Sequence, residues 1–422
     1  MVLLKSGGTV VYHGPLGTDS STMIRYFEGN GAPKCPKHKN PAEYMLEAIG
    51  AGDPNRKNED WGNIWKNSPE CRQRQEEIEA FIRDREGAGP RAVDDRQFAM
   101  PITAQVMAVL KRTFTSYWRS PEYTIGLMML HIFTGLFNSF SFYKLGFTNL
   151  DMQGRLFSIF MTLTISPPLI QQLQPKFLSI RNLFVSRENN SKIYHWSAWV
   201  LSAVIVEIPY RLVAGTVYFV VWYFPIDFPR DSATVGYNWL MMMLFELYYL
   251  GFGQAIASFS PNELMASLLV PIFFMFIVAF CGVLVPYAAM PRFWRVWMYP
   301  LSPFTYVLEG FLGTLTHQVP VRCAEAELAK FTPPPNTTCS DYVQGFLQLA
   351  GGYVEERAGE CRFCAYEDGD QFVAGFNIKY GHRWRDVAIV VGYVVFNFAM
   401  VFVCTWIYLG GAKRAFKRAL RR

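Results

Sequence analysis

Long, uncharged apolar stretches constrain most strongly how this chain can fold. Six of them lie between residues 123 and 409, at Tyr123–Phe142, Leu156–Leu173, Tyr194–Phe224, Tyr237–Ser258, Leu264–Val285 and Val387–Leu409. A helix rises ~1.5 Å per residue, so about 20 residues cover a hydrocarbon core of roughly 30 Å. Residues 125–130 and 270–277 show no polar face at helical spacing, which a soluble surface helix would require. The sequence therefore predicts a mainly α fold with a polytopic six-helix membrane domain.

Basic residues are unevenly distributed along the 422 residues, whose formal net charge is +6. Lysine and arginine are concentrated before the first stretch, between the second and third, and in the tail Lys413–Arg422. Six crossings place these segments on one side of a membrane, and the positive-inside rule makes that side the cytosol. We therefore expect both termini in the cytosol and a tail that rests on anionic lipid rather than on nucleic acid.

Four of the eight cysteines fall in residues 317–385, which the six crossings place outside the cell. An oxidising compartment favours two disulfides among Cys323, Cys339, Cys361 and Cys364. Of the three possible pairings we favour Cys323 with Cys364 and Cys339 with Cys361, because a bridge within Cys361-x-x-Cys364 would close a cramped loop. A zinc site is the alternative, but no histidine or second Cys-x-x-Cys supports it.

Residues 1–100 predict a small α/β segment that is not a whole domain. Val2–Leu4 and Thr9–Tyr12 flank a turn and predict a hairpin. A two-stranded ribbon is marginal in water, so we expect it to join a larger sheet. Helices are expected over Ser21–Glu28, after the capping residue Asn40, and from Ser68 to Glu86.

Residues 101–120 predict a helix that leads into the first span. Over Thr103–Tyr117, apolar residues recur at helical spacing while Lys111 and Arg112 face away. A helix of this kind can lie in the membrane interface. An ordinary linker helix is the alternative.

Two apolar stretches carry features typical of a binding surface. The second contains Ser166-Pro167-Pro168, an irregularity that is tolerated where a helix faces protein or a water-filled path. The fifth has a face that suits binding of varied hydrophobic ligands, although contact with lipid or other helices explains the same pattern. Its members are Met265, Leu268, Leu269, Ile272, Phe273 and Phe276. The short apolar run 301–315 predicts a helix that dips partway into the outer leaflet.

Three ionisable residues, Glu207, Arg211 and Glu246, fall inside predicted spans. Charge within a membrane is costly unless it is paired or faces a wet cavity. Glu207 and Arg211 stand four residues apart in the favourable acid-first order, and Glu246 lies at a similar depth on the next helix. We expect a structural cluster of these three side chains; a proton relay is the alternative.

Motifs for catalysis are absent from the sequence. It contains no phosphate-binding Gly-x-x-x-x-Gly-Lys-Ser/Thr loop, no His-Glu-x-x-His and no Gly-x-Ser-x-Gly. Lys5-Ser-Gly-Gly-Thr9 is similar to a cassette signature, but a β-rich run follows it, so no helix N-terminus would face a phosphate there. We expect no ATP hydrolysis, no cofactor and no metal in this chain by itself.

Several motifs resemble a known family. They are Asn40-Pro-Ala-Glu-Tyr-Met-Leu-Glu47, Arg187-Glu-Asn-Asn-Ser-Lys-Ile-Tyr194, Glu207-Ile-Pro-Tyr210, Cys281-Gly-Val-Leu-Val-Pro286 and Phe293-Trp-Arg-Val-Trp-Met-Tyr-Pro-Leu-Ser-Pro-Phe304. Over essentially its whole length the chain resembles the C-terminal half of fungal pleiotropic drug resistance transporters, which are G-type ATP-binding cassette exporters. The resemblance implies the end of a second cassette followed by a second, ABC-2 type membrane domain, with ATP and Mg²⁺ bound on cassettes outside this chain.

The resemblance also implies roles for individual residues. Arg181, Arg187, Glu188 and Tyr194 belong to a coupling loop that rests on a cassette. Val283 and Leu284 match a hydrophobic valve. The second and fifth spans line a substrate cavity, and its implied residues are Phe157, Phe160, Met161, Thr164, Leu268, Leu269, Ile272, Phe273 and Phe276.

Together these expectations describe part of a plasma-membrane exporter of hydrophobic xenobiotics or lipids that works with an N-terminal half or another half-transporter. A nonfunctional gene fragment or a membrane scaffold is the alternative. Asn336 is a glycosylation acceptor in the outer segment. The expected organisation is a cytosolic segment at 1–100, a connecting helix at 101–120, five spans and the dipping helix at 121–316, an extracellular loop at 317–385, and the last span with the basic tail at 386–422.

Overall fold

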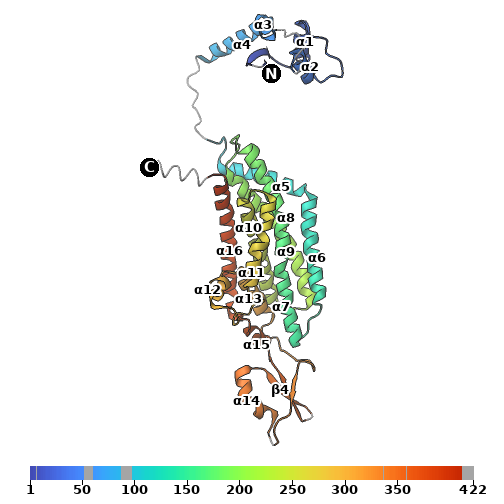
Figure 1. Ribbon diagram of the computed structural model, residues 1–422, viewed down its shortest axis with the longest axis vertical. Coiled ribbons are helices and arrows are strands. Elements are labelled where there is room, and N and C mark those ends of the chain that lie inside the picture. The colour runs from blue at the N-terminus through green and yellow to red at the C-terminus, as the bar shows by residue number, and fades with distance from the viewer. Residues whose placement is uncertain (6, 52–59, 87–96, 336, 358, 411–422) are drawn as a thin grey trace, which may run out of the picture. The chain divides into compact units, whose positions relative to one another are not determined.

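The computed structural model describes residues 1–5, 7–51, 60–86, 97–335, 337–357 and 359–410. The chain divides into two compact units, Met1–Arg96 and Gln97–Arg422, each of which is described by itself. Helices dominate both units (Figure 1).

The first unit is a small hairpin packed against helices. β1 (Val2–Lys5) pairs with β2 (Thr9–His13) in antiparallel register, as predicted. The elements that follow are η1 (Thr18–Ser20), α1 (Ser21–Gly29), α2 (Pro41–Ala48), α3 (Trp61–Asn67) and α4 (Pro69–Glu86). Tyr12, Phe27 and Trp61 are buried in its core. Among the described residues this sheet has two strands, and β2 packs against α3.

The second unit is a bundle of long helices. Those up to the middle of the chain are α5 (Ile102–Trp118), α6 (Pro121–Ser141), α7 (Asn149–Thr164), α8 (Ser166–Leu183), α9 (Trp196–Ile226) and α10 (Ser232–Phe259). A π-helical turn, η2 (Phe184–Glu188), continues α8, so that α7, α8 and η2 form one helical run of 40 residues. The last long helix is α16 (Arg383–Tyr408), and α5 lies across one end of the bundle (Figure 1).

Five helices in the described ranges are long and apolar enough to cross a membrane, and they coincide with predicted stretches one to four and six. The fifth stretch is shorter than predicted. α11 (Glu263–Ala279) has 17 residues and ends at Ala279 instead of Val285. Gly282 adopts a left-handed conformation with φ 96°, and Pro286 follows, so the backbone cannot continue as a helix there.

α10 is the most enclosed of these helices. The most apolar stretch of α10 is 72% buried, compared with 28% for the corresponding stretches of α6 and α16. It packs against α8, α9 and α16, and a Cβ atom on Gly251 would lie 3.0 Å from the Cβ atom of Asn397 on α16. The small residue therefore permits the close approach of α10 and α16.

Two short helices follow α11. α12 (Arg292–Leu301) carries exposed aromatic residues, including Phe293 and Trp297. α13 (Pro303–Leu315) forms at the predicted place and is almost wholly buried against α7, α10 and α16. The Ser302 hydroxyl before it donates to the Ile277 carbonyl at 2.8 Å, which ties the start of α13 to α11.

A disulfide-bonded segment lies between α13 and α16. Its elements are β3 (Ala329–Phe331), α14 (Cys339–Ala350), β4 (Tyr353–Arg357), β5 (Glu360–Cys364), α15 (Gly369–Ala374) and η3 (Tyr380–His382). The strands form an antiparallel sheet in the order β3-β5-β4. Cys323 pairs with Cys364 and Cys339 with Cys361, which is the nested arrangement. Asn336 lies outside the described residues.

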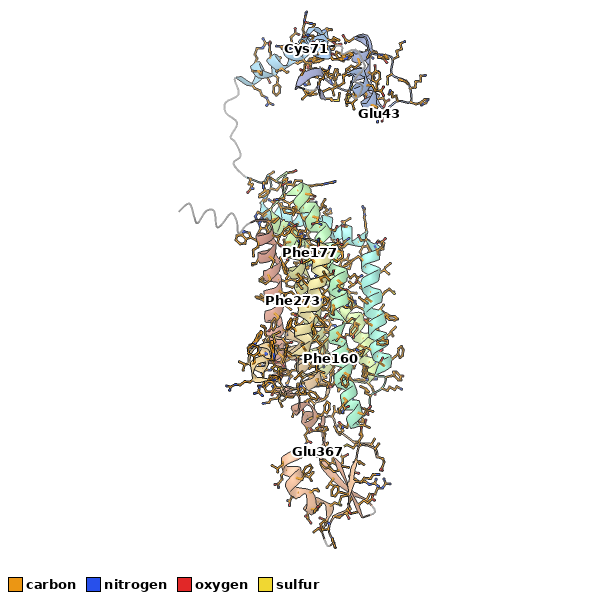
Figure 2. The ribbon with its side chains drawn as sticks, viewed as in Figure 1. Glu43, Cys71, Phe160, Phe177, Phe273 and Glu367 are labelled. Carbon is orange, nitrogen blue, oxygen red and sulfur yellow. A yellow bond between two sulfur atoms is a disulfide. The ribbon has the colours of Figure 1, made fainter. Side chains whose placement is uncertain are left out.

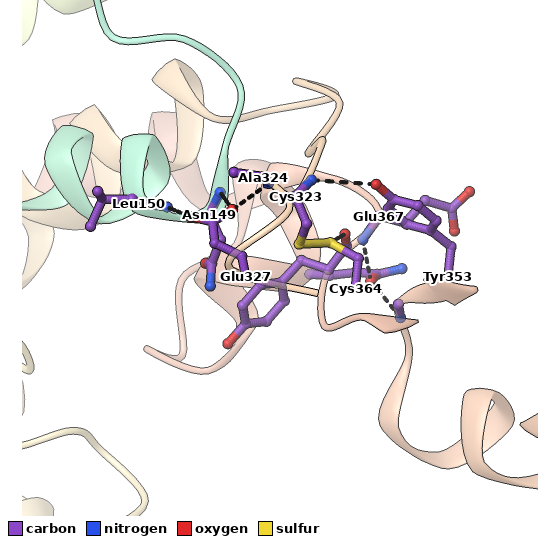
Figure 3. The surroundings of a disulfide bond; sticks show 11 residues. Asn149, Leu150, Cys323, Ala324, Glu327, Tyr353, Cys364 and Glu367 are labelled. Carbon is purple, nitrogen blue, oxygen red and sulfur yellow. Dashed lines mark hydrogen bonds between the residues drawn. A yellow bond between two sulfur atoms is a disulfide. The ribbon is translucent and has the colours of Figure 1, made fainter. Parts of the chain in front are cut away.

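The segment is attached to the helical bundle by hydrogen bonds next to one disulfide (Figure 3). The Glu327 carboxylate accepts from the backbone N–H groups of Asn149 and Leu150, at 3.2 and 2.9 Å. The Arg322 N–H also donates to the Phe147 carbonyl at 2.8 Å. The start of α7 and the disulfide-bonded segment are therefore joined.

Candidate functional site

A buried polar cluster joins α6 and α9 inside the bundle. The Tyr123 hydroxyl lies 2.7 and 2.9 Å from the two oxygens of Glu207 and donates to this carboxylate. Arg211 Nε lies 3.5 Å from Glu207 Oε2, and Arg211 Nη2 donates to the Tyr123 hydroxyl at 3.1 Å. Glu207 and Arg211 have no exposed surface, so each depends on the other for charge compensation.

Glu246 on α10 has a different partner from the one expected. Its carboxylate binds the Tyr249 hydroxyl and lies 3.1 Å from His131 Nε2 on α6. The Arg211 guanidinium instead lies 5.6 Å from the centre of the Tyr249 ring. The structure thus brings the three predicted residues into one neighbourhood through Tyr249.

The histidine of this cluster holds a defined set of hydrogen bonds. Its Nδ1 lies 2.7 Å from the Leu127 carbonyl, which can only accept, so Nδ1 carries a proton. Its Nε2 faces Glu246 Oε1 at 3.1 Å and the Tyr249 hydroxyl at 3.3 Å. Gly215 makes room for this pair, because a Cβ atom there would lie 2.6 Å from Glu246 Cγ.

The implied cavity residues form exposed surface on two helices. On α11 only Ala266 and Val270 are buried, while Leu268 and Phe276 are 54% and 46% exposed. Ile272 and Phe273 are exposed as well, and Met265 and Leu269 lie beside them. α11 packs on α8, α10 and α13. Its opposite face is an apolar surface that no described residue covers.

The implied cavity residues on α7 differ from one another in exposure. Phe157 and Met161 are exposed, whereas Phe160 and Thr164 are partly buried. Figure 2 marks Phe160 on α7 and Phe273 on α11. α7 and α11 both pack against α13, so the structure places the two sets around a shared neighbour.

The implied valve residues follow the end of α11. Val283 is partly buried against the bundle core, and Leu284 is 58% exposed. A Cβ atom on Gly282 would lie 3.2 Å from the Tyr299 ring. The turn that carries Val283 and Leu284 therefore rests on α12.

The implied coupling loop contains one residue with an internal role. Arg181 is fully buried, and its Nη1 donates to the carbonyls of Ala257 and Ser260 at 2.9 and 2.7 Å. Its Nη2 donates to the Pro261 carbonyl at 3.2 Å. Arg181 thus satisfies carbonyls at the C-terminal end of α10 and offers no surface to a partner, unlike the exposed Arg187.

Glu188 and Tyr194 fasten the same loop to α5. Arg112 of α5 forms an ion pair with Glu188, and its Nη2 donates to the Tyr194 hydroxyl at 3.0 Å. The bond to Glu188 raises the pKa of Arg112, so the pair stays charged at neutral pH. The His195 N–H donates to Gln105 Oε1 at 2.7 Å, and burial lowers the pKa of His195.

A second charged cluster, which the sequence analysis did not identify, joins α13 to α16. The Glu309 carboxylate lies 2.8 Å from His382 Nδ1 and accepts from Arg385 Nη2 at 2.8 Å. Arg385 also donates to Asp386 at 2.8 Å. Glu309 is the isolated charge within the apolar run 301–315. This charge is the sequence feature from which the cluster could have been predicted.

Metal-binding clusters are not found in the described ranges. No group of three or more histidine, cysteine, aspartate or glutamate side chains there could hold a metal ion. The arrangement is a rigid bundle with internal ion pairs, an apolar face on α11 and a loop fastened to α5.

Comparison with protein families decides what kind of bundle this is. Residues 104–316, about half of the chain, match the ABC-2 type transporter family. The chain belongs to this family. In this ABC-2 type chain, the match extends from α5 through α13. A second match, to the CDR ABC transporter family, covers residues 364–416.

Curated relatives of this ABC-2 type chain are fungal transporters. It is 42% identical to the brefeldin A resistance protein of Schizosaccharomyces pombe, over 97% of its own length. It is 38% identical to ABC multidrug transporter H of Aspergillus fumigatus and 37% identical to protein SNQ2 of Saccharomyces cerevisiae, over 98% and 96% of its length. The chain spans only 27%, 29% and 27% of these three relatives.

Proposed function

We propose that this ABC-2 type chain is the membrane-spanning part of an ATP-driven exporter of hydrophobic xenobiotics or lipids in the plasma membrane. The observation that carries the proposal is the uncovered apolar face of α11, which includes Leu268, Ile272 and Phe276. Adaptable aromatic and aliphatic surfaces of this kind suit varied apolar ligands. The names of two relatives, an ABC multidrug transporter and a brefeldin A resistance protein, support the same class of cargo.

The substrate cavity would form between α7, α11 and a second membrane half. That half is an N-terminal half or another half-transporter, and it brings the nucleotide-binding domains on which ATP and Mg²⁺ act. Val283 and Leu284 would close the cavity as a valve. The exposure of the α11 face in this chain supports a site that is completed by a partner.

Six crossings follow if α11 is counted with the five longer helices. Its 17 residues rise roughly 26 Å, and the apolar turn that follows supplies the remaining depth. Both termini would then be cytosolic and residues 317–385 extracellular, with α5 in the inner interface and α13 dipping into the outer leaflet. The basic tail would rest on anionic membrane lipids.

The loop after α8 would couple the cassettes to the bundle. Arg187 is exposed for contact with a cassette, and Glu188 and Tyr194 hold the loop to α5. Arg181, at the other end of the loop, is bonded to the end of α10. A cassette that displaces this loop would therefore move α5 and α10 together.

Efflux of a fluorescent apolar dye tests the proposal. The chain is produced with a partner half that carries functional cassettes, and ATP-dependent dye transport is measured in membrane vesicles. Phe276→Asn on α11 should lower transport at least several-fold, while Phe396→Asn, at an exposed position on α16, should change it little. Equal effects of the two variants would contradict a cavity on α11.

A nonfunctional fragment or a membrane scaffold is the second candidate. Dye transport that does not change when the chain is added to its partner would support this reading over export.

A further inference from the structure

An open apolar groove lies between α5 and α9, apart from the faces of α7 and α11. It has a volume of about 810 Å³. Met107, Leu110 and Phe114 line it from α5, and Ile205, Ile208 and Pro209 line it from α9. Volumes of this size and lining accommodate small apolar ligands or lipid chains.

The exposed face of α5 is typical of a helix in a membrane interface. Met107, Lys111, Phe114 and Trp118 follow one another at helical spacing, and all four are exposed. An apolar stripe with a tryptophan and a basic residue places a helix at the level of the lipid headgroups. The groove beside this stripe therefore opens toward lipid.

Lys111 is the cation that lines this groove. Among the described residues no acidic side chain pairs with it, whereas the neighbouring Arg112 is already bound to Glu188. The Lys111 ammonium is thus available to an anion, and a single basic side chain near a membrane surface attracts anionic lipid.

We propose that this groove binds an anionic glycerophospholipid, with one acyl chain between α5 and α9 and the headgroup phosphate on Lys111. The apolar walls would hold the chain, and Lys111 would select for negative charge. α5 and α9 are already packed through buried residues such as Val109 and Tyr117, so the groove exists before the lipid arrives. The proposal does not depend on export.

Photolabelling of the full chain in lipid nanodiscs tests the site. The probes are phosphatidylserine and phosphatidylcholine, each with the same photoreactive acyl chain, and labelled peptides are identified by mass spectrometry. Phosphatidylserine should label peptides of α5 and α9 in preference to phosphatidylcholine. Lys111→Gln should reduce this labelling about fivefold, and Lys111→Arg should retain it.

Two further variants distinguish lipid binding in the groove from nonspecific contact of lipid with the protein surface. Lys144→Gln removes an exposed cation beyond the other end of α6 and should leave labelling of α5 and α9 unchanged. Ile205→Trp should fill the groove and reduce labelling by both probes, in protein whose thermal unfolding matches that of the parent. Equal labelling by the two lipids, or labelling that Lys111→Gln does not reduce, would overturn the proposal.

Discussion

At the scale of single residues, the interior of the bundle depends on compensated charge. Glu207 and Arg211 are both fully buried, and Tyr123 bonds to both of them. The sequence predicted this pair because four residues along a helix is a local relation. It did not predict His131 as the partner of Glu246, because periodicity along one helix carries no information about which side chain a neighbouring helix presents.

Removal of Arg211 should strongly destabilise the fold. Arg211→Met leaves the Glu207 carboxylate buried without its cation, which should cost about 3–5 kcal/mol of unfolding free energy. The double variant Arg211→Met with Glu207→Leu should recover much of this loss, since both charges are gone. The unfolding free energies of the single and the double variant are measured by unfolding with sodium dodecyl sulfate in mixed micelles. A single variant as stable as the parent would contradict the importance of the pair.

At the scale of helices and segments, the sequence located most of the spans but not their ends. α7 begins at Asn149, earlier than the predicted stretch, and a polar residue of its second turn is satisfied by a tertiary contact: Arg155 is buried and donates to the Leu315 carbonyl at 3.1 Å. A hydropathy scale gives arginine an unfavourable value whatever its partners in the fold are, so the predicted stretch begins after Arg155. α3, with seven residues, is too short for its periodicity to be recognised.

Arg181 and Arg187 offer a matched pair of arginines in one loop. Arg181→Leu leaves buried carbonyls at the end of α10 without donors, so we expect a loss of about 3 kcal/mol or more in unfolding free energy. Arg187→Leu removes an exposed guanidinium and should change stability by less than about 0.5 kcal/mol. The micelle unfolding assay compares the two, and a larger effect at Arg187 would contradict the capping role.

The disulfides should stabilise the segment between α13 and α16 as a local unit. They join residues separated by 41 and 22 positions, and bridges over loops of that size contribute about 3–4 kcal/mol each. Replacing all four cysteines by serine should make residues 317–385 sensitive to trypsin while α6 and α9 remain protected. Fragments separated by gel electrophoresis show the outcome. Cleavage that is the same with and without the disulfides would count against this role.

At the scale of the whole molecule, glycosylation reports the direction in which the helices are inserted into the membrane. Asn189-Asn190-Ser191 matches the same acceptor pattern as Asn336. If both termini are cytosolic, Asn336 faces the lumen during synthesis and becomes glycosylated, whereas Asn189 stays bare. Treatment with an N-glycosidase should therefore increase the gel mobility of the parent but not of Asn336→Gln. A shift that persists in Asn336→Gln and disappears in Asn189→Gln would reverse the topology.

The hydrogen bonds between the disulfide-bonded segment and the start of α7 have a mechanical consequence. Glu327 binds the first N–H groups of α7, and the disulfide at Cys323 keeps the chain near Glu327 in place. Phe157 and Met161 lie on this same helix, α7. An antibody fragment that clamps the disulfide-bonded segment would thus restrain α7 without touching Phe157 or Met161.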